Sequence, residues 1–548
     1  MALTRRRFVS GSLSSAAGLG FGWPVFLVRQ SFAQPDTAPR MRLEEFVKDP
    51  KRVAGLKRAV QVMKDRDPSD PRSWFFQAAV HSVRPDWVEE AKRRDPKVAQ
   101  VDQARFWNQC PHYGQESANF LLWHRAYVYY FERVLRDAAE DPTLSLPYWN
   151  YTDEAQRTFP AVFADDDSDP VTRRPRNPLF DARREAAFMA GLYKLTPDAV
   201  AVPDAKDFFG ASEAEGFAGG VGDRDRNTKG LIEQAPHDLL HFAIGGSVGF
   251  GTSADPGSIS GRTNGLMASV PTAAFDPIFW VHHCNIDRLW SVWDCLADRV
   301  WGAVPSQSWF AEKPWWFYDV DGSVQNLERA FYLTHGKLGI HFESDSSTCK
   351  PLSSNPPVGI LASRSTGTAA ASSEIASLRP PQEIGRAEVK LKLSAKVPTT
   401  RSVSFTPAPV FGAKSLLEAL TVAPPSVRRG VALELDGIQV EFAPSVRYDV
   451  YVNLPSGQTP RRSAPNYVGT LALFGIEPSL GAQPVHGAVT QRFDVTKAAR
   501  SKGFDPKTLR VTVVPVPLLE PREGASQLLR DGGVAIRAIR VVVTEVRQ

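Results

Sequence analysis

The spacing of apolar residues divides this chain into two regions with different expected secondary structure. From residue 40 to about 345, aliphatic and aromatic side chains recur every three or four positions, which predicts helices with one buried face. After residue 386 apolar and polar positions alternate, which predicts strands. The expected fold class is multidomain: a mainly α-helical domain with a central helical bundle, followed by an all-β, sandwich-like C-terminal domain.

Three of the predicted helices carry histidines on their apolar faces. They are expected at residues 116–139, 236–246 and 276–293. The histidines that face inward are His124, His237, His241 and His283. Pro236 is expected to open the second helix, and Asp276 with Pro277 is typical of a helix start. Histidines that face one another from neighbouring helices are the usual way to build a metal site in a bundle.

The second half of the chain predicts a linker and a set of strands. Residues 346–386 are rich in Ser, Pro, Ala and Thr and are expected to link the helical domain, 34–345, to a β-domain at 387–548. The predicted strands lie at 387–394, 431–442, 446–454, 509–516 and 534–543. Asp436-Gly437 is typical of a two-residue hairpin turn.

Composition and charge favour small-molecule chemistry over nucleic-acid binding. The chain has 548 residues, of which 43% are hydrophobic and 23% charged, as in ordinary globular proteins. Its net charge of +5 is small for this length, and no run of Lys and Arg alternates with aromatic residues. No nucleic-acid partner is therefore expected.

The N-terminus has the features of an export signal. Arg5, Arg6 and Arg7 precede an uncharged stretch that reaches Val28, and a small-residue cleavage site ends at Ala33. This pattern predicts a twin-arginine signal peptide at 1–33, no membrane span after its removal, and a periplasmic or secreted protein. An uncleaved anchor or a plain basic tail is the alternative.

Six of the ten histidines fall in two clusters. The first cluster combines Cys110-Pro111-His112 with His124, and the second combines His237 and His241 with the His282-His283 pair. Neutral imidazole is the usual nitrogen ligand of copper, zinc and iron. Two such clusters predict a pair of metal ions with positions open to a small ligand.

Three motifs identify the family that this chain resembles. They are WHRAYVYYFE at 123–132, PYWNY at 147–151 and VPTAAFDPIFWVHHCNIDRLW at 270–290. These motifs resemble the tyrosinase and polyphenol oxidase family, over roughly residues 75 to 295. The resemblance implies an enzyme with two copper ions in a type-3 centre, which uses dioxygen to oxidise phenolic small molecules to ortho-quinones.

The resemblance also implies a ligand set. The first copper would take His81, His112 and His124, and the second would take His237, His241 and His283. His112 and His124 are twelve positions apart, a wider spacing than in most family members, which an insertion within 113–119 would explain. His282 is expected to contact the ligand histidines without binding copper itself. Asp287 is expected to stabilise the helix packing around them.

Cys110 resembles the cysteine that some family members bond covalently to a ligand histidine. A thioether between Cys110 and His112 is therefore expected, and it would fix the orientation of the imidazole. The alternative is a small buried apolar residue. Cys284, Cys295 and Cys349 would then remain, an odd number without a disulfide framework.

Three further positions are expected to shape the reaction. Glu233 matches a carboxylate that holds a water near the substrate in several relatives, and it could help to deprotonate a monophenol; its alternative is a solvated charge. Asp238 stands where many tyrosinases have Asn, and would hold that water or the neighbouring imidazole. Val270 is smaller than the Phe that plant catechol oxidases often have there, which favours an open substrate entrance.

The C-terminal domain is similar to the β-domain that covers the active site in many polyphenol oxidases. A latent enzyme is therefore expected, with Leu473 or Phe474 inserted toward the coppers; the alternative for either residue is packing inside the β-domain. A haemocyanin-like dioxygen carrier, or an oxidase restricted to diphenols or aminophenols, shares the same ligand pattern. A zinc hydrolase is disfavoured because the clusters lack ligating carboxylates.

Overall fold

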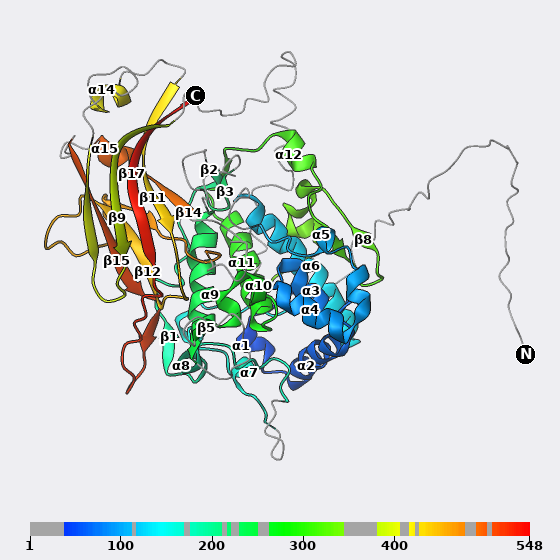
Figure 1. Cartoon of the computed structure of the whole chain (residues 1–548). Coiled ribbons are helices and arrows are strands. Elements are labelled where there is room, and N and C mark those ends of the chain that lie inside the picture. Colours follow the sequence, from blue (N-terminus) through cyan, green and yellow to red (C-terminus); the bar gives the residue numbers. More distant parts are fainter. Residues whose placement is uncertain are drawn as a thin grey trace, which may run out of the picture.

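The structure is a computed structural model in which a helical part stands beside a β-sandwich (Figure 1). It describes residues 38–111, 117–168, 176–210, 216–220, 229–249, 262–344, 381–405, 416–421, 427–476, 489–500 and 507–547. The expected signal peptide at 1–33, the expected ligand His112, Cys349 and residues 346–380 of the expected linker lie outside these ranges. The described residues have the predicted fold class, a mainly α-helical part followed by an all-β, sandwich-like part.

The helical part is built around α6, which is buried along almost its whole length. The helices are α1 Leu43–Phe46, α2 Pro50–Asp65, α3 Trp74–His81, α4 Pro85–Arg94, α5 Gln103–Phe106, α6 Asn119–Ala139, α7 Ala161–Ala164, α8 Ala186–Met189, α9 Asp238–Gly245, α10 Val270–Ala273, α11 Ile278–Asp294 and α12 Gln307–Ala311. Helices α2 and α11 pack directly against α6. Because α6 is covered on every side, its polar residues need partners inside the protein.

Local capping explains where the main helices begin. The hydroxyl of Ser73 accepts a hydrogen bond from the backbone N–H of Phe76 at the start of α3. A carboxylate oxygen of Asp276 accepts one from the N–H of Ile278 at the start of α11, as the sequence predicts. Helix α9 is Asp238–Gly245, and the helical turn Glu233–His237 that leads into it is kinked where Ala235 has an extended backbone, directly before Pro236. His237 directly precedes α9 and still lies one turn from His241.

Short strands connect and flank the helices. They are β1 Tyr193–Leu195, β2 Asp207–Gly210, β3 Gly219–Gly220, β4 Ser247–Gly249, β5 Arg262–Asn264, β6 Val300–Gly302, β7 Phe317–Tyr318 and β8 Val324–Gln325. The sandwich strands are β9 Gln382–Lys392, β10 Thr399–Ser404, β11 Val427–Ile438, β12 Val446–Val452, β13 Tyr467–Thr470, β14 Val489–Asp494, β15 Thr508–Pro517 and β17 Ala535–Arg547, with α14 Leu416–Thr421 and α15 Thr496–Ala499 between them.

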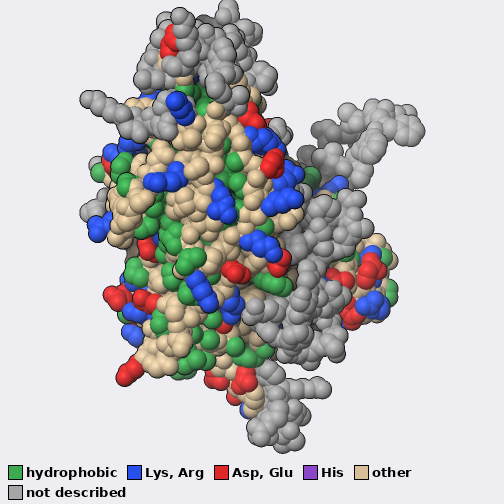
Figure 2. All heavy atoms as spheres, turned by 60° about the vertical axis from the view of Figure 1, so that its left-hand side comes forward, with side chains coloured by type: hydrophobic (Ala, Val, Ile, Leu, Met, Phe, Trp, Pro, Cys, Tyr) green, Lys and Arg blue, Asp and Glu red, His purple; other side chains and the backbone are tan. Residues whose placement is uncertain are grey.

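Two antiparallel four-stranded sheets form the sandwich. One has the order β10-β15-β12-β13 and the other the order β14-β11-β17-β9. The longest pairing joins β11 and β17, from Val427 opposite Arg547 to Asp436 opposite Ala538. Aliphatic residues of both sheets fill the space between them. On the face that comes forward in Figure 2, Lys and Arg side chains are mixed with Asp and Glu.

Two sequence predictions for the β-domain are wrong in detail. The Asp436-Gly437 pair does not turn the chain: β11 continues to Ile438, and its register with β14 shifts between Leu435 and Ile438. Gly437 has a φ of 69°, and a glycine with positive φ serves a β-bulge as well as a hairpin turn. The linker also ends earlier than predicted, because β9 already begins at Gln382.

The expected absence of disulfides is wrong as well. Cys295, just after α11, is disulfide-bonded, and its partner lies outside the described residues. Cys110 and Cys284 are free thiols, and both are buried. The odd number of remaining cysteines therefore did not imply that all of them were unpaired.

The sandwich is joined to the helical part by backbone and side-chain contacts. Strand β1 pairs with β16 Leu519–Pro521 of the C-terminal domain. Arg530 forms an ion pair with Glu185 across the same junction. The loop after β13 lies against α9, where the ring of Phe474 contacts the rings of His241 and Phe242. Among the described residues, no helix combines the length and apolar character needed to span a membrane.

Candidate metal centre

Two groups of buried side chains meet at the centre of the helical part. The first group is His81, Cys110 and His124, and the second is His237, His241, His282 and His283; within each group the potential ligand atoms all lie within 4.8 Å of one another. Helices α3 and α6 supply the histidines of the first group, and α9 and α11 supply most of the second. The rings of His124 and His283 stack with centroids 4.3 Å apart, so the two groups are adjacent.

Four of these imidazoles are held by an oxygen at Nδ1. The contacts are His81 to the carbonyl of Val270 at 3.2 Å, His124 to the carbonyl of Phe120 at 2.8 Å, His237 to the carboxylate of Asp238 at 2.9 Å and His241 to the carbonyl of Met267 at 2.7 Å. An oxygen acceptor places the proton on Nδ1 and leaves the Nε2 lone pair for a metal. All four rings are therefore oriented as metal ligands usually are.

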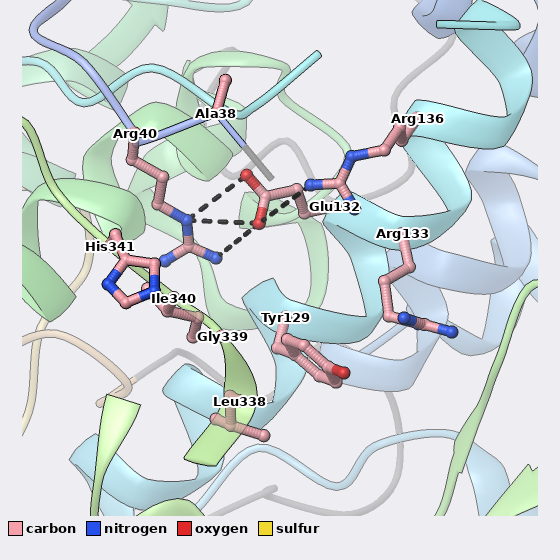
Figure 3. A pocket seen from close by; sticks show the side chains of 10 residues that line it. All are labelled: Ala38, Arg40, Tyr129, Glu132, Arg133, Arg136, Leu338, Gly339, Ile340 and His341. Carbon is pink, nitrogen blue, oxygen red and sulfur yellow. Dashed lines mark hydrogen bonds and ion pairs between the residues drawn. The ribbon is translucent and has the colours of Figure 1, made fainter. Parts of the chain in front are cut away.

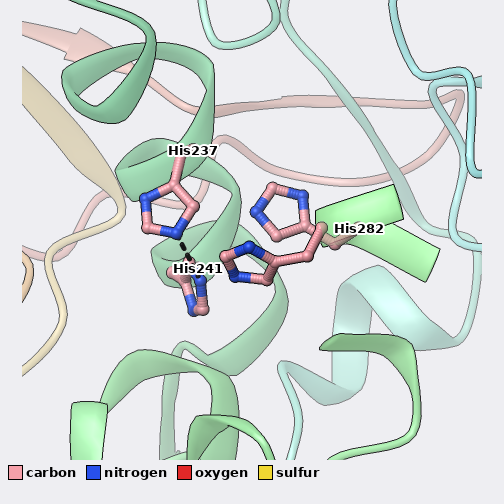
Figure 4. Close-up of side chains that lie close together, drawn as sticks. His237, His241 and His282 are labelled. Carbon is pink, nitrogen blue, oxygen red and sulfur yellow. Dashed lines mark hydrogen bonds between the residues drawn. The ribbon is translucent and has the colours of Figure 1, made fainter. Parts of the chain in front are cut away.

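The free ring nitrogens fit a bound cation. His237 and His241 place their Nε2 atoms 3.1 Å apart (Figure 4). Because Nδ1 carries the proton in both rings, two lone pairs face each other, which favours a cation close to both. Within the described part of the chain, neither ring nitrogen of His283 nor Nε2 of His282 has a hydrogen-bond partner, although all are buried. Such buried nitrogens cost free energy unless a metal binds them.

Burial keeps these imidazoles neutral. Desolvation lowers the pKa of His81 and of His282 to about 3. It also lowers the pKa of His124, His237 and His283 well below the ordinary value, and the neighbouring imidazoles act in the same direction. Neutral imidazole is the form that binds a metal, so the centre is prepared for metal at neutral pH. A set of imidazoles without carboxylates suits copper.

The first group contains two of its three expected histidines. His81 and His124 both lie in it, while His112 falls outside the described residues. The Sγ atom of Cys110 lies 3.5 Å from Nε2 of His124. Burial, the largest cause, raises the pKa of this thiol well above its usual value. Cys110 is therefore a buried, protonated thiol beside the ligand cluster.

A buried ion network supports the helices that carry His124 and His283. Arg40 donates to Glu132 of α6 (Figure 3) and to Asp287 of α11, with N–O distances of 2.9 and 3.0 Å. Arg125, next to His124, donates to the other oxygen of Asp287 at 2.6 Å. The side chains of all four residues are at most 7% exposed. The network thus joins the turn of α6 beside His124 to the turn of α11 that follows His283.

Three ionisable side chains lie together beside the second group. The ammonium of Lys229 is 2.8 Å from a carboxylate oxygen of Asp238 and 3.4 Å from one of Glu233. Burial, the largest cause, raises the pKa of Glu233 to about 8 and that of Asp238 to about 6, against the lowering effect of Lys229. The sequence analysis did not single out Lys229. Its position four residues before Glu233 was the only local signal for this pair.

The C-terminal domain contributes an aromatic ring to the centre. Phe474 stacks on His241 with ring centroids 4.1 Å apart and planes 21° apart, and lies 5.8 Å from the ring of His237. Its carbonyl oxygen accepts a hydrogen bond from Lys229 at 2.8 Å. Leu473 is buried next to it. Of the two candidate residues, Phe474 is the one whose ring packs against the histidine rings.

The remaining expected site residues lie around the histidines. The Val270 side chain is partly exposed at the start of α10, and its carbonyl oxygen holds His81. The Tyr151 hydroxyl lies 3.3 Å from Nδ1 of His282. His282 is thus held by a side chain on one nitrogen, whereas neither nitrogen of His283 has a partner among the described residues. This difference favours His283 as the ligand.

Comparisons with known proteins agree with this geometry. Residues 71–198 and 182–296 match the common central domain of tyrosinase, and residues 381–524 match a domain of unknown function. The chain is 27% identical to the tyrosinase HcTyr1 of Hahella sp. (strain CCB-MM4), over 84% of this chain and 91% of that protein. It is 26% identical to a chloroplastic polyphenol oxidase of Malus domestica, over 75% of this chain and 65% of that protein.

Solved structures of similar fold include both parts of the chain. The structure of latent apple tyrosinase matches with a TM-score of 0.53 and 21% identity, over 94% of this chain and 98% of that one. Latent aurone synthase from a natural source, itself a polyphenol oxidase, matches with a TM-score of 0.54 and 19% identity, over 94% and 91%. These matches show that a helical core followed by a sheet-rich C-terminal domain is an established arrangement.

Proposed function

The chain belongs to the tyrosinase and polyphenol oxidase family, and on that premise we propose that it uses dioxygen and two copper ions to oxidise phenols to ortho-quinones. The observation that carries the proposal is the convergence of buried, neutral imidazoles whose Nδ1 atoms are anchored and whose remaining nitrogens face one another. The relatives named above are enzymes, which favours catalysis over a haemocyanin-like carrier.

Each copper would take three imidazoles. His81, His112 and His124 would hold the first ion, and His237, His241 and His283 the second. When bound, the copper pair supplies the site at which dioxygen is reduced with electrons from the phenol. The protein keeps the imidazoles neutral, orients them through the Nδ1 contacts and excludes water by burial. His282, held by Tyr151, supports the packing around the second site.

Glu233 and Asp238 would have different tasks. A carboxylate whose pKa is raised to about 8 exchanges a proton readily near neutral pH, so Glu233 is suited to accept the proton of a monophenol, directly or through a water. Asp238 holds Nδ1 of His237 and so fixes that ring. Both carboxylates also contact Lys229, which limits repulsion between them. An oxidase restricted to diphenols or aminophenols would use the same centre without the base.

The protein as described would be latent. The Phe474 ring stacks on His241, and the small side chain of Val270 would leave the substrate entrance open once Phe474 moves away. Cleavage within the linker, followed by movement of the C-terminal domain, would let substrate reach the coppers. We also assign residues 1–33 to twin-arginine export, which carries folded proteins and would place the enzyme in the periplasm or outside the cell.

A thioether between Cys110 and His112 completes the proposal for the first copper. Its basis is the buried thiol of Cys110 beside His124, together with the Cys-x-His spacing. Its formation would replace the S–H bond of Cys110 and a ring C–H bond of His112 by a C–S bond, while dioxygen takes up the two electrons and two protons as hydrogen peroxide. The bond would hold the His112 imidazole in one orientation. Intact-mass measurement of the reduced, metal-free protein should show the loss of two hydrogens. A Cys110 that alkylates normally after unfolding contradicts the bond.

The experiment that tests the function combines metal content with product formation. Metal-free protein is loaded with copper, cleaved in the linker, and given 4-methylcatechol and tyrosol while quinone is followed optically. Quinone formation that depends on bound copper supports the proposal, and oxidation of tyrosol shows whether monophenols are hydroxylated. A copper-loaded, cleaved protein that oxidises neither phenol contradicts it.

A further inference from the structure

Phe474 presents two chemical groups to the centre at once. Its ring stacks on His241, and its carbonyl oxygen accepts a hydrogen bond from the ammonium of Lys229. The ammonium lies 5.6 Å from the centroid of that same ring. In any phenylalanine the carbonyl carbon is joined to the ring through Cα and Cβ. Phe474 therefore occupies the centre as a 3-arylpropanoyl group, with an aromatic ring at one end and a hydrogen-bond acceptor at the other.

Lys229 is also held by two carboxylates of the helical part, which would remain in place if the C-terminal domain moved away. Asp238 accepts from it at 2.8 Å and Glu233 lies 3.4 Å away, and both belong to the helical part. The Lys229 side chain is 3% exposed. An ammonium has three N–H donors, and a donor left without an acceptor in a buried site is costly. When Phe474 withdraws, the N–H group of Lys229 that donates to its carbonyl needs another acceptor.

We propose that Lys229 is a specificity-determining residue, which selects phenols that carry a carbonyl acceptor at the end of a two-carbon side chain. Such a substrate would stack its ring where the Phe474 ring lies and place its acceptor where the Phe474 carbonyl lies. The acceptor can be the carbonyl of an ester or amide, or a carboxylate, because each of these groups can accept the hydrogen bond from Lys229. The inference rests on the proposed phenol oxidation and adds the substrate class.

The test compares substrates that differ only in the acceptor. They are 4-ethylcatechol, 3-(3,4-dihydroxyphenyl)propionate and the methyl ester of that acid. The copper-loaded protein is cleaved in the linker and carries Phe474→Gly, so that the ring is removed and the backbone carbonyl at position 474 can leave Lys229. Within that background, Lys229→Met removes the donors at similar length, and Lys229→Gln keeps a neutral N–H donor. Copper content and circular dichroism confirm that the variants are loaded and folded.

The expected result is a change in the ratio of kcat/KM values. With Lys229 present, the ester or the acid is preferred over 4-ethylcatechol, and Lys229→Met lowers that preference by about tenfold or more, mainly through KM. Lys229→Gln recovers part of the preference. A gain confined to the acid identifies charge as the property recognised, whereas a gain for both identifies the hydrogen bond. Ratios that stay the same in all variants overturn the proposal, because a purely structural lysine affects all three substrates alike.

A binding measurement separates this inference from the proposed function. Calorimetry follows 3-phenylpropionamide, which has the ring and the acceptor but no phenol, as it binds to the copper-free, linker-cleaved Phe474→Gly protein. Binding that weakens about tenfold or more on Lys229→Met supports the recognition even if no catechol is oxidised. Equal binding to both variants, or no binding to either, contradicts it whatever the oxidase activity.

Discussion

Phe474 of the C-terminal domain stacks on His241 of the helical part, with ring centroids 4.1 Å apart. The two residues are 233 positions apart (474 minus 241), and Lys229 ties the carbonyl of Phe474 to the same region. Phe474 is fully buried in this arrangement. The β-domain is thus in direct contact with a side chain that we assign as a copper ligand.

Removal of the Phe474 ring is expected to activate the intact chain. Because the ring fills the space above His241, Phe474→Ala should raise the rate of catechol oxidation by about tenfold or more without any cleavage, as an intramolecular competitor is lost. Phe493→Ala is the matched control, since Phe493 is buried in the sandwich and has no described ring contact with a histidine. If both variants stay as inactive as the parent, Phe474 does not block the centre.

The neighbouring histidines His282 and His283 are expected to respond differently to substitution. Neither ring nitrogen of His283 has a described partner, whereas the Tyr151 hydroxyl contacts His282. His283→Ala should therefore lose about half of the bound copper and all oxidase activity. His282→Ala should retain most of its copper. Metal analysis after dialysis distinguishes the two, and the reverse result would assign His282 as the ligand.

The ion network behind the centre is expected to contribute strongly to stability. Asp287→Asn would leave Arg40 and Arg125 buried with one carboxylate fewer, and removal of one partner from a buried network costs about 3–5 kcal/mol of unfolding free energy. As a control, Glu90→Gln breaks an exposed pair with Arg93 and should leave the urea midpoint unchanged. Equal midpoints for both variants would show that the network has no net stabilising effect.

The buried carboxyl of Asp294 is expected to make stability depend on pH. Burial, the largest cause, raises its pKa to about 7, against the attraction of Arg125. The folded state therefore keeps this proton to higher pH than the unfolded state, and the associated stability is lost as pH rises toward 7. The slope is at most about 1.4 kcal/mol per pH unit between about pH 4 and 7. Urea unfolding of Asp294→Asn should lack this slope, and an unchanged slope would assign it elsewhere.

The helices that carry the clustered histidines could be predicted from local signals. The apolar period around His124 predicted a helix over 116–139, and the structure has α6 from Asn119 to Ala139. Asp276 and Pro277 correctly marked the start of α11, because a cap acts within one turn. The distances among the histidines could not be derived in this way. The family resemblance, not the period, indicated that they converge.

The contacts that link distant segments had no local signal. Arg40 and Asp287 are 247 residues apart, and nothing near either residue indicates the other. Lys229 stands beside a segment of charged residues and would ordinarily be solvated, yet it is buried among two carboxylates and a carbonyl. The Asp436-Gly437 pair was misinterpreted as a turn because positive φ at glycine suits both a turn and a bulge. Tertiary packing decides each of these cases.

The most direct test of the central claim is a copper titration of the metal-free Phe474→Ala protein, with dioxygen uptake measured on 4-methylcatechol after each addition. We predict that uptake rises with bound copper, reaches its maximum when two ions are bound per chain, and is abolished by His241→Ala. Protein that holds two copper ions and consumes no dioxygen in the presence of the catechol would contradict the account.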